Sequence, residues 1–102
     1  MIIVAGQVDF DPRYLPEILA DIRALEAATR LEDGCLYYAM AFDDLETGHA
    51  TVLERWRDEA ALNAHLRTPG LKAFQERKLP RAKHFSIKLY EIAAERELVV
   101  PN

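Results

Sequence analysis

Residues 35–42 are the part of the sequence that most restricts the fold. Their sequence, Cys-Leu-Tyr-Tyr-Ala-Met-Ala-Phe, gives both faces of a β-strand only apolar or aromatic side chains. Residues 2–8 are also mostly apolar and rich in branched side chains. An antiparallel sheet with one face in water alternates apolar and polar residues along its strands. A sheet built from these two segments therefore needs a cover on each of its faces.

The remaining segments predict the other elements of one α+β fold. Apolar residues at steps of three and four predict a helix over 16–30, and Asp58 and Thr68-Pro69 are good helix starts. We expect strands at 2–8, 35–42, 50–56 and 84–93, and helices at 16–30, 59–66 and 69–79. This β-α-β-β-α-α-β order is the split arrangement of ferredoxin-like folds, a four-stranded antiparallel sheet with its helices on one face. The chain of 102 residues is expected to be a single domain, 1–102, with a tail at about 95–102.

The predicted helices can cover only one face of this sheet. The other face would then expose an apolar patch of several hundred Å², which monomers rarely do. We therefore expect a homodimer in which two sheets pack face to face about a twofold axis.

The composition excludes several classes of site. The single cysteine, Cys35, cannot form an intramolecular disulfide or a multi-cysteine zinc site, and His49, His65 and His84 lack metal-ligand spacing. There is no glycine-rich phosphate loop. We expect no bound metal and no organic cofactor. The sequence predicts no membrane span and no secretory signal, and a cytoplasmic location fits best.

Charge is distributed unevenly along the chain. Residues 1–50 contain 3 Lys/Arg and 10 Asp/Glu, whereas residues 51–102 contain 10 Lys/Arg and 7 Asp/Glu. The basic excess lies in residues 72–88. We interpret it as a solvated helix face and loop; steering of an anionic small molecule stays open. A nucleic-acid partner is not expected, because the chain has neither a strongly basic domain nor a nucleic-acid-binding motif.

His65 is the most informative polar residue. On its short predicted helix it shares a face with Leu62 and Leu66, so it should point toward the sheet. A buried neutral imidazole can accept or donate a proton near neutral pH. The alternative is a core histidine with a structural hydrogen bond only.

Trp56 and Glu54 lie on the same face of the third predicted strand. Trp56 could form the wall of a pocket for a planar substrate and donate its indole N–H, or it could be plain core. Glu54 could orient a histidine or a hydroxyl, or form a salt bridge at a strand edge.

Four more residues are candidates for substrate binding. Gln7 in the first strand and Gln75 on the inner face of the last helix could each bind a ligand carbonyl, although each could be a structural amide. Tyr38 and Phe74 could line a pocket, with core packing as the alternative.

Several of these residues belong to a pattern that spans nearly the whole chain. The pieces Asp33-Gly34-Cys35-Leu36-Tyr37-Tyr38, Glu54-Arg55-Trp56, 58–66, Thr68-Pro69 and Lys72-Ala73-Phe74 closely resemble the antibiotic biosynthesis monooxygenase (ABM) domain. The resemblance implies a dimeric α+β barrel with a cleft between sheet and helices in each subunit. Trp56 matches the strand tryptophan of the family, Glu54 the acid before it, and His65 the histidine of the short helix.

The family includes cofactor-independent monooxygenases acting on phenolic, quinol or anthrone-like rings, heme-degrading enzymes and a branch that processes signal molecules. Many members have histidine where this chain has Gly70. Gln75 and Gln7 stand where the heme-degrading branch has a ligating histidine and an asparagine, which argues against heme degradation because glutamine is a poor iron ligand.

We therefore expect an enzyme that oxidises a small electron-rich aromatic compound with O₂. Triplet oxygen reacts slowly with closed-shell molecules, so without a cofactor the substrate itself must supply the electrons, as a phenolate or enolate can. His65 would be the base, with Trp56 as ring wall and Gln7 or Gln75 as carbonyl binders. The alternatives are a ligand-binding or assembly domain without catalysis and an isomerase-like enzyme that moves a proton without O₂.

Overall fold

The first strand, β1 (Ile2–Phe10), runs through the middle of a four-stranded antiparallel sheet with strand order β2-β3-β1-β4. The computed structural model describes residues 1–102, apart from the side chain of Leu79. The other elements are η1 (Pro12–Tyr14), α1 (Leu15–Thr29), β2 (Cys35–Asp44), β3 (His49–Trp56), α2 (Glu59–Leu66), α3 (Pro69–Lys78), η2 (Leu79–Arg81) and β4 (Ala82–Glu91). The predicted α+β, ferredoxin-like order and antiparallel sheet are confirmed.

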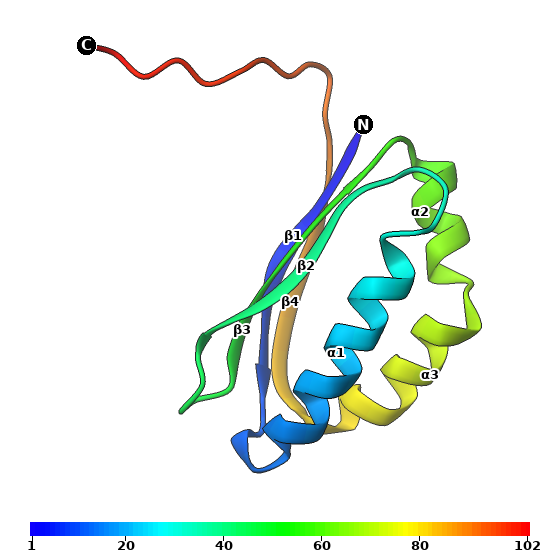
Figure 1. Ribbon diagram of the computed structural model, residues 1–102, viewed down its shortest axis with the longest axis vertical. Helices are drawn as coiled ribbons and strands as arrows, with labels where there is room; N and C mark the ends of the chain where they lie inside the picture. Colours follow the sequence, from blue (N-terminus) through cyan, green and yellow to red (C-terminus); the bar gives the residue numbers. More distant parts are fainter.

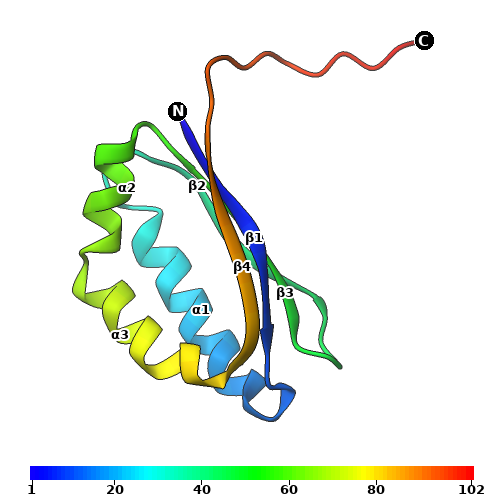
Figure 2. The same ribbon diagram turned by 180° about the vertical axis from the view of Figure 1, so that it is seen from behind.

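All three α-helices pack on one face of the sheet, and no described element covers the other face (Figures 1 and 2). In the registers of the central strands, Val4 lies opposite Glu54 of β3 and Leu89 of β4. These three positions therefore share the face that looks toward the helices, since directly opposed residues of antiparallel strands point to the same side.

Local chemistry sets the ends of the elements. The Asp58 carboxylate accepts a hydrogen bond from the Ala61 amide at 2.8 Å and so caps α2. Gly48 closes the hairpin between β2 and β3 with φ of 77°. A Cβ at this position would also lie 2.1 Å from the Phe10 carbonyl oxygen, so only glycine fits the turn.

The core between sheet and helices has two parts. The larger part joins α1 and α3 to the sheet, and its buried residues are Val8, Phe10, Leu15, Ile18, Ile22, Ala50, Val52 and Phe74. The smaller part joins α2 to the sheet, and its buried residues are Ile2, Val4, Tyr38, Trp56, Ala61 and Leu62. Most of the inward stripe predicted for the first helix is buried, namely Leu15, Ile18, Ile22 and Thr29, whereas its members Leu19 and Leu25 are partly buried.

The structure corrects two details of the strands. β1 continues to Phe10, past the predicted end at Val8, because Phe10 is 1% exposed and belongs to the core. Leu36 does not share a face with Tyr38, as the simple alternation of a strand predicts. The register passes from Cys35 opposite Trp56 directly to Tyr37 opposite Arg55, so Leu36 is a bulge residue and is 51% exposed.

The uncovered face of the sheet carries a band of apolar side chains. Leu53, Tyr37 and Tyr90 are 40%, 46% and 48% exposed, and Ile3 and Ala5 lie between them in the registers of β1. The same registers place Thr51, Arg55 and Lys88 beside this apolar band. The band is the surface for which the sequence predicts a partner.

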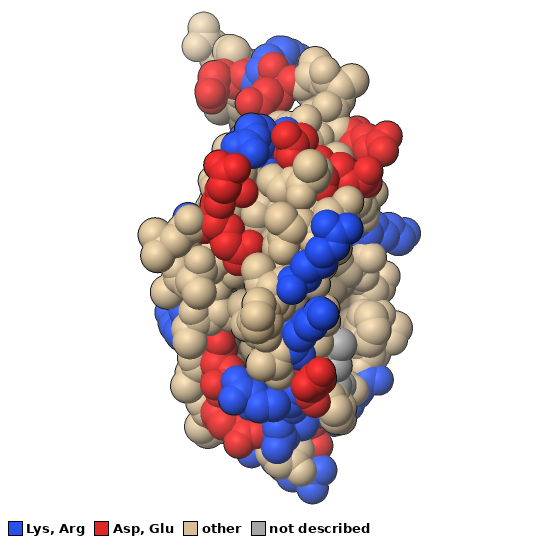
Figure 3. Space-filling model, turned by 90° about the vertical axis from the view of Figure 1, so that its right-hand side faces the viewer, with Lys and Arg blue, Asp and Glu red and all other residues tan. Residues whose placement is uncertain are grey.

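The basic segment 72–88 is balanced by acids of α1. Lys78, which is 3% exposed, forms an ion pair with Asp21, and Arg81 pairs with Glu17 at 3.1 Å. Figure 3 shows Lys and Arg side chains beside Asp and Glu over this side of the molecule. The segment thus holds α3 and η2 against α1. None of the helices in the described chain is long and apolar enough to cross a membrane.

Candidate functional site

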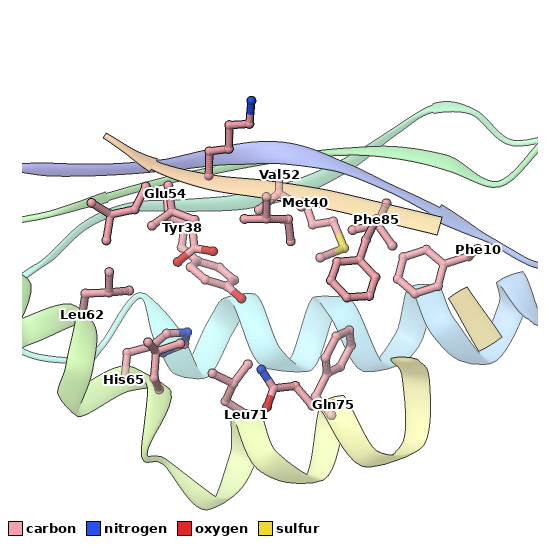
Figure 4. A pocket seen from close by; sticks show the side chains of 17 residues that line it. Phe10, Tyr38, Met40, Val52, Glu54, Leu62, His65, Leu71, Gln75 and Phe85 are labelled. Atoms are coloured by element: carbon pink, nitrogen blue, oxygen red, sulfur yellow. The ribbon is translucent and has the colours of Figure 1, made fainter. Parts of the chain in front are cut away.

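A cavity of about 320 Å³ lies between the covered face of the sheet and helices α2 and α3 (Figure 4). Its volume is within the range of cavities that bind small molecules. Most of its walls are apolar, with Val4, Val8 and Val52 from the sheet and Leu62 and Leu71 from the helices. The side chains that bring polar groups to it are those of Tyr38, Glu54, His65 and Gln75. Lys88 also borders the cavity, but it lies opposite Ala5, so its side chain is on the uncovered face.

His65 enters this cavity from α2. It is 1% exposed, with the Trp56 ring 4.8 Å from its own ring centre and the Tyr38 ring edge-on at 5.3 Å. Its Nδ1 lies 3.0 and 3.1 Å from the two carboxylate oxygens of Glu32, in the turn after α1. The imidazole is therefore held on one side by a hydrogen bond and on its faces by aromatic rings.

Glu54 is the second buried polar group of the site. Its Oε1 accepts a hydrogen bond from the Trp56 indole N–H at 3.0 Å, and the residue is 8% exposed. Burial raises the pKa of Glu54, and this effect exceeds the opposing effects of the Trp56 hydrogen bond and the nearby His65. The protonated carboxyl group is thus favoured more than in water and can donate a hydrogen bond into the cavity.

Tyr38 supplies a hydroxyl group to the same end of the cavity, and Figure 4 shows this hydroxyl pointing toward the helices. Burial, followed by the charges of Glu54, Glu26 and Glu32, raises the pKa of Tyr38 well above its ordinary value. Tyr38 therefore stays a neutral O–H at physiological pH, and it can donate a hydrogen bond to a ligand oxygen.

The predicted site residues divide into three groups. The structure brings His65, Glu54, Tyr38, Phe74 and Gln75 together around the cavity. Trp56 is 0% exposed and lies behind His65, with its N–H bonded to Glu54, so it does not form the cavity wall. Gln7 is exposed and lies on the uncovered face, opposite Thr51 and Ser86, so it does not reach the cavity.

One side of the cavity is incompletely closed. Phe85, Ile87 and Leu89 of β4 line it and are 55%, 44% and 43% exposed. Gln75 from α3 also lines the cavity, and it is exposed. A ligand can thus enter between β4 and α3 and reach His65 at the deep end. Among the described residues, no three His, Cys, Asp or Glu side chains are grouped to hold a metal ion.

Glu32 was missed by the sequence analysis. It is 33 residues from His65 in the chain and belongs to a polar turn, so no periodicity connects the two. The end of the first helix at Thr29 places the turn 31–34 next to the helix layer, to which α2 also belongs. This position of the turn is the sequence feature that could have pointed to Glu32.

The sequence profile of the family described as antibiotic biosynthesis monooxygenase matches residues 1–77 of this chain. The chain belongs to the antibiotic biosynthesis monooxygenase family. The matched region includes every residue of the cavity except those of β4. This membership confirms the resemblance found in the sequence and covers His65, Glu54 and Trp56 with their partner Glu32.

Individual proteins and solved structures are also similar to this chain. The chain is 34% identical to the Synechocystis sp. protein sll1783 over 98 residues, 95% of this chain and 67% of that protein. A protein structure from Deinococcus radiodurans is similar with a TM-score of 0.87 at 25% identity, over 98% of this chain and all of that chain. A structure described as an antibiotic biosynthesis monooxygenase gives a TM-score of 0.83 at 26% identity, over 92% of this chain and all of the other.

Proposed function

We propose that this ABM protein is a cofactor-independent monooxygenase that oxidises a small electron-rich aromatic compound, such as a quinol, phenol or anthrone, with O₂. The observation that carries the proposal is the buried His65 at the end of an apolar cavity of about 320 Å³. A cavity of this size and polarity suits a compact ring system. Family membership supports the monooxygenase class.

The chemistry begins with removal of a proton from the ring hydroxyl. Nε2 of His65 accepts this proton, and the resulting anion transfers electrons to O₂ far more readily than the neutral ring. One oxygen atom enters the ring and the other leaves as water. The ring then supplies all four electrons and leaves as a quinone-type product, so no external reductant is required.

The surrounding residues have matching roles in this proposal. Tyr38 donates a hydrogen bond to the substrate oxygen as negative charge develops there, and Glu54 can do the same in its protonated form, which burial favours. Phe74 forms part of the apolar wall, and the Gln75 amide binds a second carbonyl or hydroxyl near the opening. Trp56 acts by holding Glu54 and by packing against His65.

The proposal is tested by measuring O₂ uptake with a panel of quinols, phenols and anthrones, above the rate without protein. We expect His65→Ala and His65→Phe to lower kcat about 100-fold or more, as loss of a general base does. Phenylalanine keeps a ring against Trp56, so it separates loss of the base from loss of packing. His84→Ala, which removes an exposed histidine of β4, is the matched control and should keep full activity.

Three results would contradict this proposal. Equal rates for the wild type and the His65 variants would remove His65 from the mechanism. Turnover of a substrate at the same rate without O₂ would identify an isomerase-like proton transfer, which the same imidazole could perform. Absence of both activities and of ligand-induced thermal stabilisation would favour a scaffold without catalysis.

We further propose that two copies pair through the uncovered sheet face. The exposed apolar band around Leu53, Tyr37 and Tyr90 supports this pairing. Such packing would bury the band in the same way as the interior of a β-sandwich.

A further inference from the structure

The contact between Glu32 and His65 links the cavity to the turn after α1. Both carboxylate oxygens lie within 3.1 Å of Nδ1. The His65 side chain is 2% exposed, whereas that of Glu32 is 26% exposed. Glu32 also lines a hollow on the outer side of α2, with Arg57 and Thr68. One carboxylate thus faces the buried ring and water at the same time.

This contact determines which ring nitrogen carries the proton. An ionised carboxylate only accepts hydrogen bonds, so Nδ1 must be the N–H donor to Glu32. In the neutral imidazole, Nε2 is then the acceptor. Nε2 has no hydrogen-bond partner among the described side chains, and His65 lines the cavity. The acceptor of the ring is therefore free to meet a substrate hydroxyl.

We propose that Glu32 is a positioning residue that keeps His65 in the Nδ1–H tautomer and stabilises the imidazolium formed when Nε2 takes a proton. Glu32 does not touch the substrate and acts through the ring alone. The proposal deepens the proposed function, since its kinetic part rests on His65 as the base.

The other titratable or charged groups around His65 are either favoured in their neutral form or paired with another residue. Glu54 of β3 and Tyr38 of β2 face the ring, and Cys35 lies near both acids. Burial favours the neutral forms of all three. The Arg57 guanidinium is paired with Asp33 and Asp58. Glu32 is therefore the charged group that hydrogen-bonds to this imidazole.

The first test measures the tautomer directly in the protein without substrate. With ¹⁵N-labelled histidine, long-range ¹H–¹⁵N NMR spectra distinguish Nδ1–H from Nε2–H rings. We expect the Nδ1–H pattern for His65 in the wild type and in Glu32→Gln, whose amide oxygen can still accept the bond. Glu32→Ala should shift the ring toward Nε2–H. Asp33→Ala, which removes the adjacent carboxylate on the surface, should leave the spectrum unchanged.

The second test separates tautomer from charge through kinetics. Glu32→Gln should lower kcat about 10- to 100-fold with little change in KM, and should move the acid limb of the pH profile of kcat/KM to lower pH, because the imidazolium loses its counter-charge. Glu32→Ala should show at least the same loss, and Asp33→Ala should retain the wild-type profile. A purely structural Glu32 would change the thermal stability without moving this limb.

The two proposals fail in different ways. An unchanged His65 tautomer in Glu32→Ala, or an unmoved acid limb in Glu32→Gln, would overturn the positioning role even in a fully active enzyme. A Glu32-dependent tautomer in a protein that consumes no O₂ with any compound of the panel would support the positioning role and reject the oxygenase activity alone.

Discussion

Glu54 is a carboxyl group with an indole N–H as its hydrogen-bond donor and apolar residues around it. Its neighbours Trp56 and His65 are buried too, so three polar side chains share one end of the core. Interiors accept such groups only when each has a partner. At the scale of single residues, the site is therefore a small network in which the Trp56 N–H and the His65 Nδ1 have partners. His65 Nε2, the second Glu54 oxygen and the Tyr38 hydroxyl have no hydrogen-bond partner among the described side chains.

We predict that Glu54→Gln increases thermal stability at neutral pH. Because burial raises the pKa of Glu54, the unfolded chain loses this proton at lower pH than the folded chain. The stability contributed by protonated Glu54 is fully present below the pKa that Glu54 has in the unfolded chain. It is lost as the pH rises through the higher pKa that Glu54 has in the folded protein. Glutamine stays neutral and still accepts the Trp56 hydrogen bond, so it avoids this loss.

The measurement is the melting temperature of wild type and Glu54→Gln from pH 3 to pH 8. We expect a gain of a few degrees at neutral pH, which corresponds to about 1 kcal/mol in a chain of this size, and no gain in acid. The exposed Glu59→Gln serves as the control and should differ little at any pH. A Glu54→Gln variant that is less stable at pH 7 would contradict the prediction.

Part of this network could be predicted from the sequence. The spacing of Glu54 and Trp56 along a strand and of Leu62 and His65 along a helix placed them on shared faces, because strand and helix periods are local properties. Glu32 could not be found in this way, since its contact depends on how the turn after α1 meets α2. The side of Gln7 stayed undecided because residues 2–8 are nearly apolar on both faces, so alternation gave no contrast.

At the scale of elements, α2 brings His65 to the cavity, and it is only eight residues long. Isolated helices of this length are unstable in water, so α2 depends on its cap and its packing. The Asp58 cap hydrogen bond, at 2.8 Å, satisfies the Ala61 amide, and Ala61, Leu62 and His65 supply the buried face. The start of α2 thus contributes to the placement of His65.

We predict that Asp58→Ala destabilises the protein by about 1 kcal/mol, the usual effect of losing an N-cap. The Ala61 hydrogen bond and Arg57 lower the pKa of Asp58 in the folded protein. The stabilisation by the cap is therefore fully present above the pKa that Asp58 has in the unfolded chain, and it is lost as the pH falls through the lower pKa in the folded protein. Chemical denaturation at pH 7 and pH 3 measures this difference. Asp58→Asn, which can still cap, should retain most of the stability at both pH values, and an Asp58→Ala variant as stable as Asp58→Asn would refute the role of the cap.

At the scale of the whole molecule, the two faces of the sheet differ. The three helices cover one face (Figure 2). The opposite face exposes Leu53, Tyr37 and Tyr90. The element order was predictable because each segment has a clear period and the connections are short. The bulge at Leu36 was not, because it depends on the register between β2 and β3.

We predict that Leu53→Glu converts a dimer into monomers. A charge at the centre of the uncovered face would have to lose its hydration in a sheet-to-sheet dimer, which is strongly unfavourable. Sedimentation velocity measures the oligomeric state. Leu31→Glu changes a leucine that is 88% exposed outside the sheet, so it should leave the dimer intact. A wild-type monomer, or a dimer that tolerates Leu53→Glu, would exclude pairing through this face.

The two outer strands of the sheet differ in what lies along them. On β2, the Glu26 carboxylate accepts the Met40 amide at 3.1 Å and Arg30 donates to the Tyr38 carbonyl at 3.1 Å. Side chains of α1 thus occupy backbone groups that an incoming strand would need. β4 forms its ladder with β1 and has no such guard among the described residues. An added strand would therefore find backbone partners free along β4, whereas two of those along β2 are already bonded to α1.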